Sequence, residues 1–121
     1  MQTNFVVQTH TTGRTVTLVL SGDLDLVSAP AMEEAMDDLA RRSDVELIIV
    51  DLRGLDFMDS TGLHLLIRVH QRAHESGRRF ALIRGREAVQ RLFDLTGLAE
   101  SLTVVDSPAQ LLEVDQTPGA S

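Results

Sequence analysis

The chain has 121 residues and a net charge of −7 at pH 7; 43% of its residues are hydrophobic and 3% are aromatic. This length suits one domain with a single core, and the acidic balance argues against nucleic-acid binding, because phosphate contacts need clustered basic side chains. The absence of cysteine excludes disulfides, zinc thiolates and a thiol nucleophile.

The start of the chain is not expected to act as a secretion signal. Met1–Gln8 lacks the positive region and apolar core that a secretion signal needs. No apolar run approaches the roughly 20 residues that span a bilayer. We therefore expect a cytoplasmic protein with no membrane contact.

The first half of the sequence predicts a hairpin, a helix and a buried strand. Alternating β-branched and apolar residues favour strands at Asn4–Gln8 and Arg14–Leu20, the second ended by Ser21-Gly22. Ser28 is typical of a helix N-cap. The nearly continuous apolar run Val45–Val50 predicts a central strand covered on both faces. Apolar residues at helical spacing lie between these two features: Met32, Ala35, Met36, Leu39 and Ala40.

The second half predicts three helices that alternate with strands. A wide apolar stripe predicts a helix from about Leu63 to Ser76, with Gly77 in a left-handed position after it. Phe80–Ile83 and Leu102–Val105 are typical of strands, with a helix between them. Ser107-Pro108 is typical of the start of a last helix.

The resulting order, β-β-α-β-α-β-α-β-α, predicts an α/β fold. Strands that alternate with single helices imply right-handed crossovers and a mixed, mostly parallel sheet, to which the first hairpin adds an antiparallel edge. We expect about four helices, one domain over residues 1–115 and a flexible tail over residues 116–121. Functional groups in such sheets gather where strands end and helices begin. The loops predicted after Leu20 and after Val50 are both acidic.

The stretch from Asp51 to Leu63 places a hydroxyl at a helix start among carboxylates. We expect a strand to end at the beginning of this stretch and a helix to begin within it. If Asp59 is the N-cap, Met58 and Leu63 form a hydrophobic staple and the hydroxyl of Ser60 is free. If Ser60 is itself the cap, its oxygen accepts a backbone N–H instead. The staple pairing favours Asp59.

A phosphate on Ser60 is compatible with this arrangement. The free N–H groups and the dipole of a helix N-terminus attract a phosphate. Asp59 and Asp56 repel it, as does Asp25 if the neighbouring loop brings it close. We therefore expect a phosphoserine to leave the fold intact and to add a charge of about −1.5 to −2 to the surface. Like charges across an interface cost several kcal/mol, which is enough to abolish a micromolar contact.

Two segments of the sequence resemble a known family. The segment Asp56-Phe57-Met58-Asp59-Ser60-Thr61-Gly62-Leu63 resembles the signature of the bacterial anti-sigma factor antagonists, which are single STAS domains. The segment Ser21-Gly22-Asp23-Leu24-Asp25 resembles their first acidic loop, with Asp23 where glutamate is common. The order of strands and helices fits this family along nearly the whole chain.

The resemblance implies a partner-switching function. The unphosphorylated domain would bind an anti-sigma factor, a serine kinase of the histidine-kinase-like ATPase type, and so release a sigma factor. The kinase would phosphorylate Ser60 and end the binding, and a PP2C-type phosphatase would reset it. ATP and magnesium belong to the kinase, so the resemblance implies no cofactor and no enzymatic activity for this chain.

The predicted site therefore combines a phosphorylation site, Ser60, with a partner-facing surface. From the residues alone, Phe57 and Met58 are equally compatible with burial and with an apolar contact beside Ser60. The alternative function is a STAS interaction module of another signalling or transport complex. The predicted partner-facing residues are Asp23, Asp25, Asp56, Phe57, Met58, Asp59, Thr61 and Gly62.

Two other functions fit parts of the same stretch. An enzyme would pair Ser60 with His64 as its base. The G-x-S-x-G elbow is absent, however, because Met58 occupies the position of the motif's first glycine. A phospho-aspartate receiver would use Asp51 at a strand end, with other carboxylates converging on Mg²⁺. Receivers also need a lysine, and all eleven basic residues of this chain are arginines. The loop arginines are expected to be solvated charges: Arg78, Arg79, Arg84 and Arg86.

Overall fold

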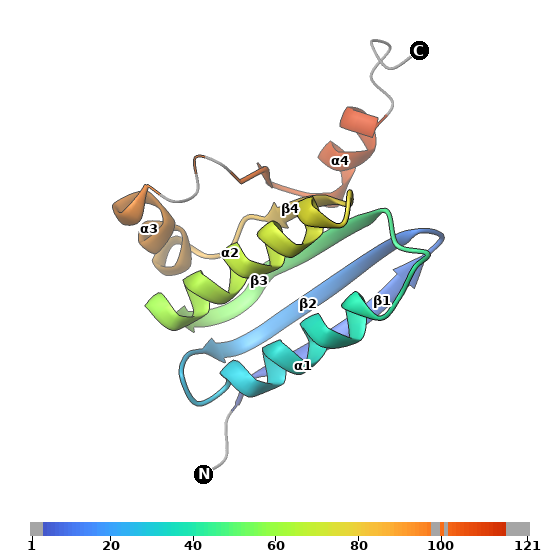
Figure 1. The fold of residues 1–121 in the computed structure, drawn as a ribbon. Helices are drawn as coiled ribbons and strands as arrows, with labels where there is room; N and C mark the ends of the chain where they lie inside the picture. Colours follow the sequence, from blue (N-terminus) through green and yellow to red (C-terminus); the bar gives the residue numbers. More distant parts are fainter. Residues whose placement is uncertain (1–3, 98–99, 101, 116–121) are drawn as a thin grey trace.

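The computed structural model describes residues 4–97, 100 and 102–115, which form the predicted order of strands and helices (Figure 1). The predicted tail, residues 116–121, lies outside the described residues. The elements are β1 (Val6–Thr12), β2 (Thr15–Leu24), α1 (Ala29–Ala40), β3 (Leu47–Met58), α2 (Ser60–Glu75), β4 (Arg79–Ile83), α3 (Glu87–Thr96), β5 (Val104–Val105) and α4 (Pro108–Asp115).

The five strands form one mixed sheet in the order β1-β2-β3-β4-β5. β1 pairs antiparallel with β2, and the other neighbouring strands are parallel, as predicted. α1 and α2 lie side by side over one face of the sheet (Figure 1). The parallel arrangement brings the carboxyl ends of β2, β3 and β4 to the same end of the molecule.

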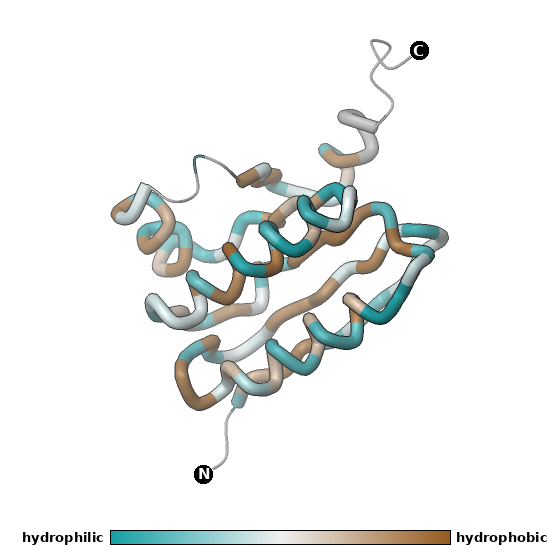
Figure 2. Tube along the Cα trace, in the orientation of Figure 1, coloured by the Kyte–Doolittle hydropathy of each residue, from teal (hydrophilic) through white to brown (hydrophobic). Residues whose placement is uncertain are grey.

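The main core lies between the sheet and the helices α1, α2 and α3. In β2, every second residue points into it: Val16, Leu18 and Leu20 are fully buried. The opposite face of β3 and β4 packs in a smaller cluster with Leu111 of α4. Hydrophobic residues accordingly run along the central strands and alternate with hydrophilic ones along α1 and α2 (Figure 2). No helix within the described residues is long and apolar enough to cross a membrane.

Both central strands are longer than the sequence predicts. The expected ends after Leu20 and after Val50 are wrong, because β2 continues to Leu24 and β3 to Met58. Glycine suggested strand ends, but here it permits close strand packing. A Cβ on Gly54 would lie 2.7 Å from the carbonyl oxygen of Leu20.

The extended pairing of β2 with β3 contains two irregularities in register. Val19 pairs with Asp51 but Ser21 pairs with Gly54, so β3 carries one extra residue between them. Gly22 pairs with Leu55 and Asp23 with Phe57, which leaves Asp56 as a second extra residue. Such bulges bend a strand and redirect side chains. Asp56 therefore lies on a bulge at the carboxyl end of β3, and not in a loop.

A buried carboxylate holds the first bulge. Asp51 is 6% exposed, and its Oδ1 accepts hydrogen bonds from the backbone N–H and Nε of Arg53, each at 3.0 Å. Its Oδ2 accepts a bond from Nη2 of Arg53 at 2.8 Å. Burial raises the pKa of Asp51, but the hydrogen bonds and charge of Arg53 outweigh burial and hold the pKa below its usual value.

This pair should make stability depend on pH in the acid range. Because the folded pKa of Asp51 is lowered, its contribution is complete above the unfolded pKa of about 3.9 and is lost as pH falls through the folded value. We expect Asp51→Asn to lower the free energy of unfolding by about 1 kcal/mol at neutral pH. The difference from wild type should vanish below the folded pKa. Urea unfolding at several pH values measures it, with Asp94→Asn, at an exposed position on α3, as control; a difference independent of pH would contradict the assignment.

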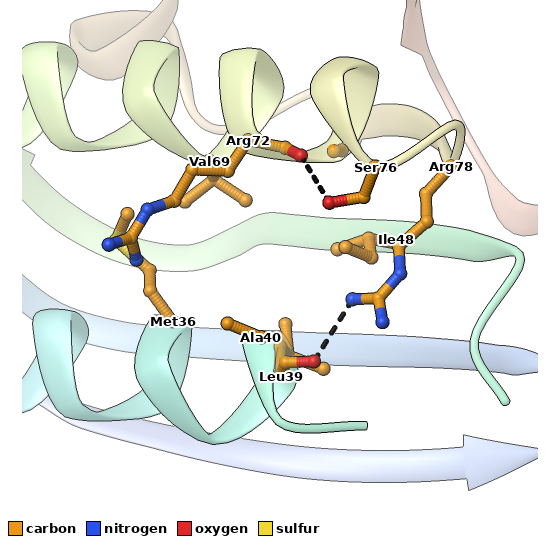
Figure 3. Close-up of a pocket in the computed structure, with 9 residues that line it drawn as sticks. Met36, Leu39, Ala40, Ile48, Val69, Arg72, Ser76 and Arg78 are labelled. Carbon is orange, nitrogen blue, oxygen red and sulfur yellow. Dashed lines mark hydrogen bonds between the residues drawn. The ribbon is translucent and has the colours of Figure 1, made fainter. Parts of the chain in front are cut away.

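Arg78 connects the end of α1 to the turn that follows α2 (Figure 3). Its guanidinium donates to the carbonyl oxygen of Leu39 at 3.0 Å and to that of Arg42. The last carbonyls of a helix lack partners within the helix, so Arg78 satisfies them. The prediction that Arg78 is a solvated loop charge is therefore wrong. The cavity beside it, between α1, α2 and the sheet, measures about 30 Å³, which holds one or two water molecules and no larger ligand.

Candidate functional site

The predicted site lies at the carboxyl end of the parallel strands. The loop between β2 and α1, the end of β3 and the start of α2 meet there, and α3 lies at the same end of the sheet (Figure 1). The backbone N–H of Asp59 donates to the carbonyl oxygen of Leu24 at 3.3 Å, which ties the start of α2 to the end of β2. The two segments that resemble the antagonist family are therefore adjacent.

Asp59 is the N-cap of α2. It has an extended backbone, with φ −103° and ψ −172°, and its Oδ1 accepts a hydrogen bond from the backbone N–H of Gly62 at 3.1 Å. Of the two cap assignments, the one with Asp59 is confirmed. Ser60 is the first residue of the helix and is exposed, and its hydroxyl makes no hydrogen bond with any of the described residues. The hydroxyl is thus free and accessible.

Two of the predicted partner-facing residues are buried beneath Ser60. Met58 is 6% exposed and lies in the same core cluster as Leu63, consistent with the staple. A Cβ on Gly62 would lie 2.7 Å from both the Leu24 carbonyl oxygen and Cγ of Met58. These two residues therefore support the surface from below, whereas Thr61 between them is half-buried.

Asp25 organises the loop between β2 and α1. Its Oδ1 accepts hydrogen bonds from the backbone N–H of Val27 at 3.0 Å and of Ser28 at 3.1 Å. The hydroxyl of Ser28 donates to the carbonyl oxygen of Asp23 at 2.8 Å and accepts from the backbone N–H of Asp25 at 2.9 Å. Ser28 is the N-cap residue of α1, as predicted, but its side chain makes no capping hydrogen bond to the helix; the side chain bonds to the preceding residues and closes the loop.

The loop held by Asp25 presents apolar side chains that sequence reasoning missed. Leu26 is 73% exposed and Val27 is 49% exposed. Phe57, which pairs in register with Asp23, is 50% exposed. We call Leu26, Val27 and Phe57 the apolar rim. In the sequence, Leu26 and Val27 are two apolar residues directly after an acidic turn residue. That pattern is equally compatible with burial and with exposure.

The charges around Ser60 are mostly negative, with one arginine bonded to them. Asp23 and Asp25 are half-buried, and Asp56 is exposed. Arg86, at the N-cap of α3, donates from Nη1 to Oδ1 of Asp56. Arg86 is exposed, as expected of a loop charge, but it is paired with a residue of the site.

The geometry does not support the two other functions considered. Nδ1 of His64 lies 2.6 Å from the carbonyl oxygen of Ser60; a carbonyl only accepts, so this nitrogen carries the proton and cannot act as a base for the hydroxyl. Asp51 is held by Arg53 instead of facing a metal site. No group of three or more potential metal ligands gathers anywhere in the described ranges.

Comparisons with known proteins agree with this fold. The family model of the STAS domain matches residues 6–111. A relative from Paenibacillus polymyxa, an anti-sigma F factor antagonist, is 30% identical over 77% of this chain and 80% of its own length.

Solved structures show the same fold. An anti-sigma factor antagonist from Mycobacterium paratuberculosis superposes with a TM-score of 0.81 at 23% identity, covering 92% of this chain and 93% of that one. The phosphorylated form of the Bacillus cell fate determinant SpoIIAA superposes with a TM-score of 0.69 at 20% identity, covering 92% and 100%. The chain belongs to the STAS domain family of anti-sigma factor antagonists, regulatory proteins that are not enzymes.

Proposed function

We propose that this chain is a cytoplasmic anti-sigma factor antagonist whose binding is controlled by phosphorylation. The unphosphorylated form binds an anti-sigma factor, a serine kinase of the histidine-kinase-like ATPase type, and thereby releases a sigma factor. Phosphorylation of Ser60 by that kinase ends the binding, and a PP2C-type phosphatase restores it. The chain contributes a surface and a phosphate acceptor, without a cofactor of its own.

The observation that carries this proposal is the free hydroxyl of Ser60. The Asp59 side chain already caps the first turn of α2, so the Ser60 hydroxyl is not needed as a cap. An exposed hydroxyl with no internal partner is accessible to a kinase, and its modification breaks no hydrogen bond of the fold. The structural relatives support the same proposal, since the Bacillus cell fate determinant SpoIIAA has been solved in a phosphorylated form.

The partner-facing surface combines the apolar rim with the carboxylates of Asp23, Asp25 and Asp56. Exposed apolar side chains beside charged ones are typical of a binding patch. We expect the partner to offer an apolar pocket for the rim and a basic edge for the carboxylates. Asp59, Thr61 and the buried Met58 and Gly62 position this surface. The whole of residues 1–115 is proposed to act as one STAS domain.

The charge of the phosphate accounts for the switch. Asp56 and Asp59 already make the start of α2 negative, and a phosphate adds about −1.5 to −2 at its centre. The helix dipole tolerates this charge within the domain. A partner that docks over Ser60 must either remove water from the phosphate or bring a negative group of its own close to the phosphate. Either event costs several kcal/mol.

Binding by variants of Ser60 tests the proposal. Ser60→Ala and Ser60→Asp proteins serve as baits in an extract of the organism that encodes the chain, and captured proteins are identified by mass spectrometry. We expect the Ala form to recover an ATPase-type kinase, and the Asp form to recover it at least tenfold less, because even one added charge opposes docking. Thr12→Asp, an exposed position at the end of β1 and beside the start of β2, controls for net charge. Equal recovery by the Ala and Asp forms would rule out the charge switch.

A further inference from the structure

Arg86 brings a cation from α3 to the acidic surface around Ser60. Its backbone forms the N-cap of α3, and its guanidinium bonds to Asp56, thirty residues earlier in the chain. The side chains of this pair are 61% and 54% exposed. Asp56 is the extra residue of the second bulge in β3, so its side chain is directed by the bulge and not by regular strand pairing.

The other arginines at this end of the sheet are bonded elsewhere. Arg53 binds both carboxylate oxygens of the buried Asp51. Arg84 donates from Nε to Asp106 at 2.8 Å, beside β5. Arg86 thus pairs with a carboxylate of the proposed partner surface, whereas Arg53 and Arg84 pair with carboxylates outside it.

The pair between Arg86 and Asp56 is suited to exchange. Ion pairs between exposed side chains contribute little to stability, so breaking this one has a small cost. Asp56 lies four residues before Ser60, a separation that an extended chain spans in at most about 14 Å. A phosphate on Ser60 would carry up to two charges and three acceptor oxygens, and the planar fork of a guanidinium binds such a group with two parallel hydrogen bonds.

We propose that Arg86 is the counter-ion of the phosphate on Ser60: on phosphorylation its guanidinium leaves Asp56 and pairs with the phosphate. This inference rests on the proposed function and adds a second element, α3, to its regulation. The exchange removes a cation from Asp56, so phosphorylation alters the surface at two positions. The positive charge of Arg86 also favours the doubly charged phosphate at neutral pH. The neighbouring carboxylates of Asp56 and Asp59 have the opposite effect.

The second pKa of the phosphate reports this pairing. Full-length protein with phosphoserine incorporated genetically at position 60 is titrated by ³¹P NMR around the ordinary second pKa of about 6. We expect the pKa in wild type to lie about half a pH unit below that in Arg86→Gln. Arg91→Gln is the matched control, since Arg91 lies on the same helix and pairs with Glu87 instead; it should leave the pKa of the phosphate unchanged.

A third variant separates pairing with the phosphate from a structural effect. Asp56→Asn breaks the same ion pair as Arg86→Gln but frees Arg86, so it should lower the pKa of the phosphate where Arg86→Gln raises it. If Arg86→Gln leaves the pKa as in wild type, or if both variants raise it, the proposal is wrong. The phosphate is installed without a kinase, so such a failure would leave the binding test of Ser60→Ala and Ser60→Asp unaffected.

Discussion

Gly22→Ala is expected to lower the free energy of unfolding by about 3 kcal/mol or more. Gly22 has a φ of +86°, a left-handed conformation that costs a residue with a Cβ about 1–2 kcal/mol. The added Cβ would also lie 2.2 Å from the carbonyl oxygen of Asn4 and 2.8 Å from its carbonyl carbon. These are backbone atoms of the segment that precedes β1, so relief requires the backbone to move and not a side chain to rotate.

Gly13→Ala separates the two costs of that substitution. Gly13 lies in the turn between β1 and β2 with a φ of +60°, and a Cβ there would meet no atom within 4 Å. We expect a loss of about 1 kcal/mol from backbone conformation alone. Urea unfolding of both variants gives the comparison. Similar losses for the two would show that the close approach of Asn4 to Gly22 does not constrain the fold.

The order of the elements was predictable because hydrophobic periodicity is a local property. Each helix shows its apolar stripe within a few turns, and the buried strands are short apolar runs bounded by turn residues. The ends of β2 and β3 were not predictable in the same way. Gly22 and Gly54 are strand breakers by themselves, but pairing between β2 and β3 continues past them through two bulges. Bulges depend on the partner strand, and a single sequence does not carry that information.

The same distinction between local and long-range features applies to the site. The cap by Asp59 and the free hydroxyl of Ser60 followed from a local motif, and both are found in the structure. The roles of Arg78 and Arg86 were missed because their partners lie 39, 36 and 30 residues away in sequence. The exposure of Leu26 was missed, and for Phe57 the sequence was equally compatible with burial and with exposure. Only the placement of the loop and the bulge shows that both side chains face solvent.

Phe57→Ala should weaken binding of the anti-sigma partner about 100-fold, and Leu26→Ala about tenfold. Aromatic side chains that enter a partner's pocket commonly contribute 2 kcal/mol or more, and every 1.4 kcal/mol is tenfold in affinity. A leucine in such an interface typically contributes less. Both side chains are at least half exposed in the free domain, so their truncation should leave its unfolding free energy nearly unchanged. Calorimetric titration of the partner with each variant measures the affinity.

Leu95→Ala controls for the loss of exposed apolar surface outside the proposed interface. Leu95, near the end of α3, is 78% exposed, slightly more than Leu26, but it lies outside the apolar rim. If binding depended only on the total exposed apolar surface, all three truncations would weaken it in proportion to the area removed. We expect Leu95→Ala to bind like wild type. Loss of affinity in Leu95→Ala with retention in Phe57→Ala would move the interface away from Ser60, and a phosphate there would then have no partner surface to repel.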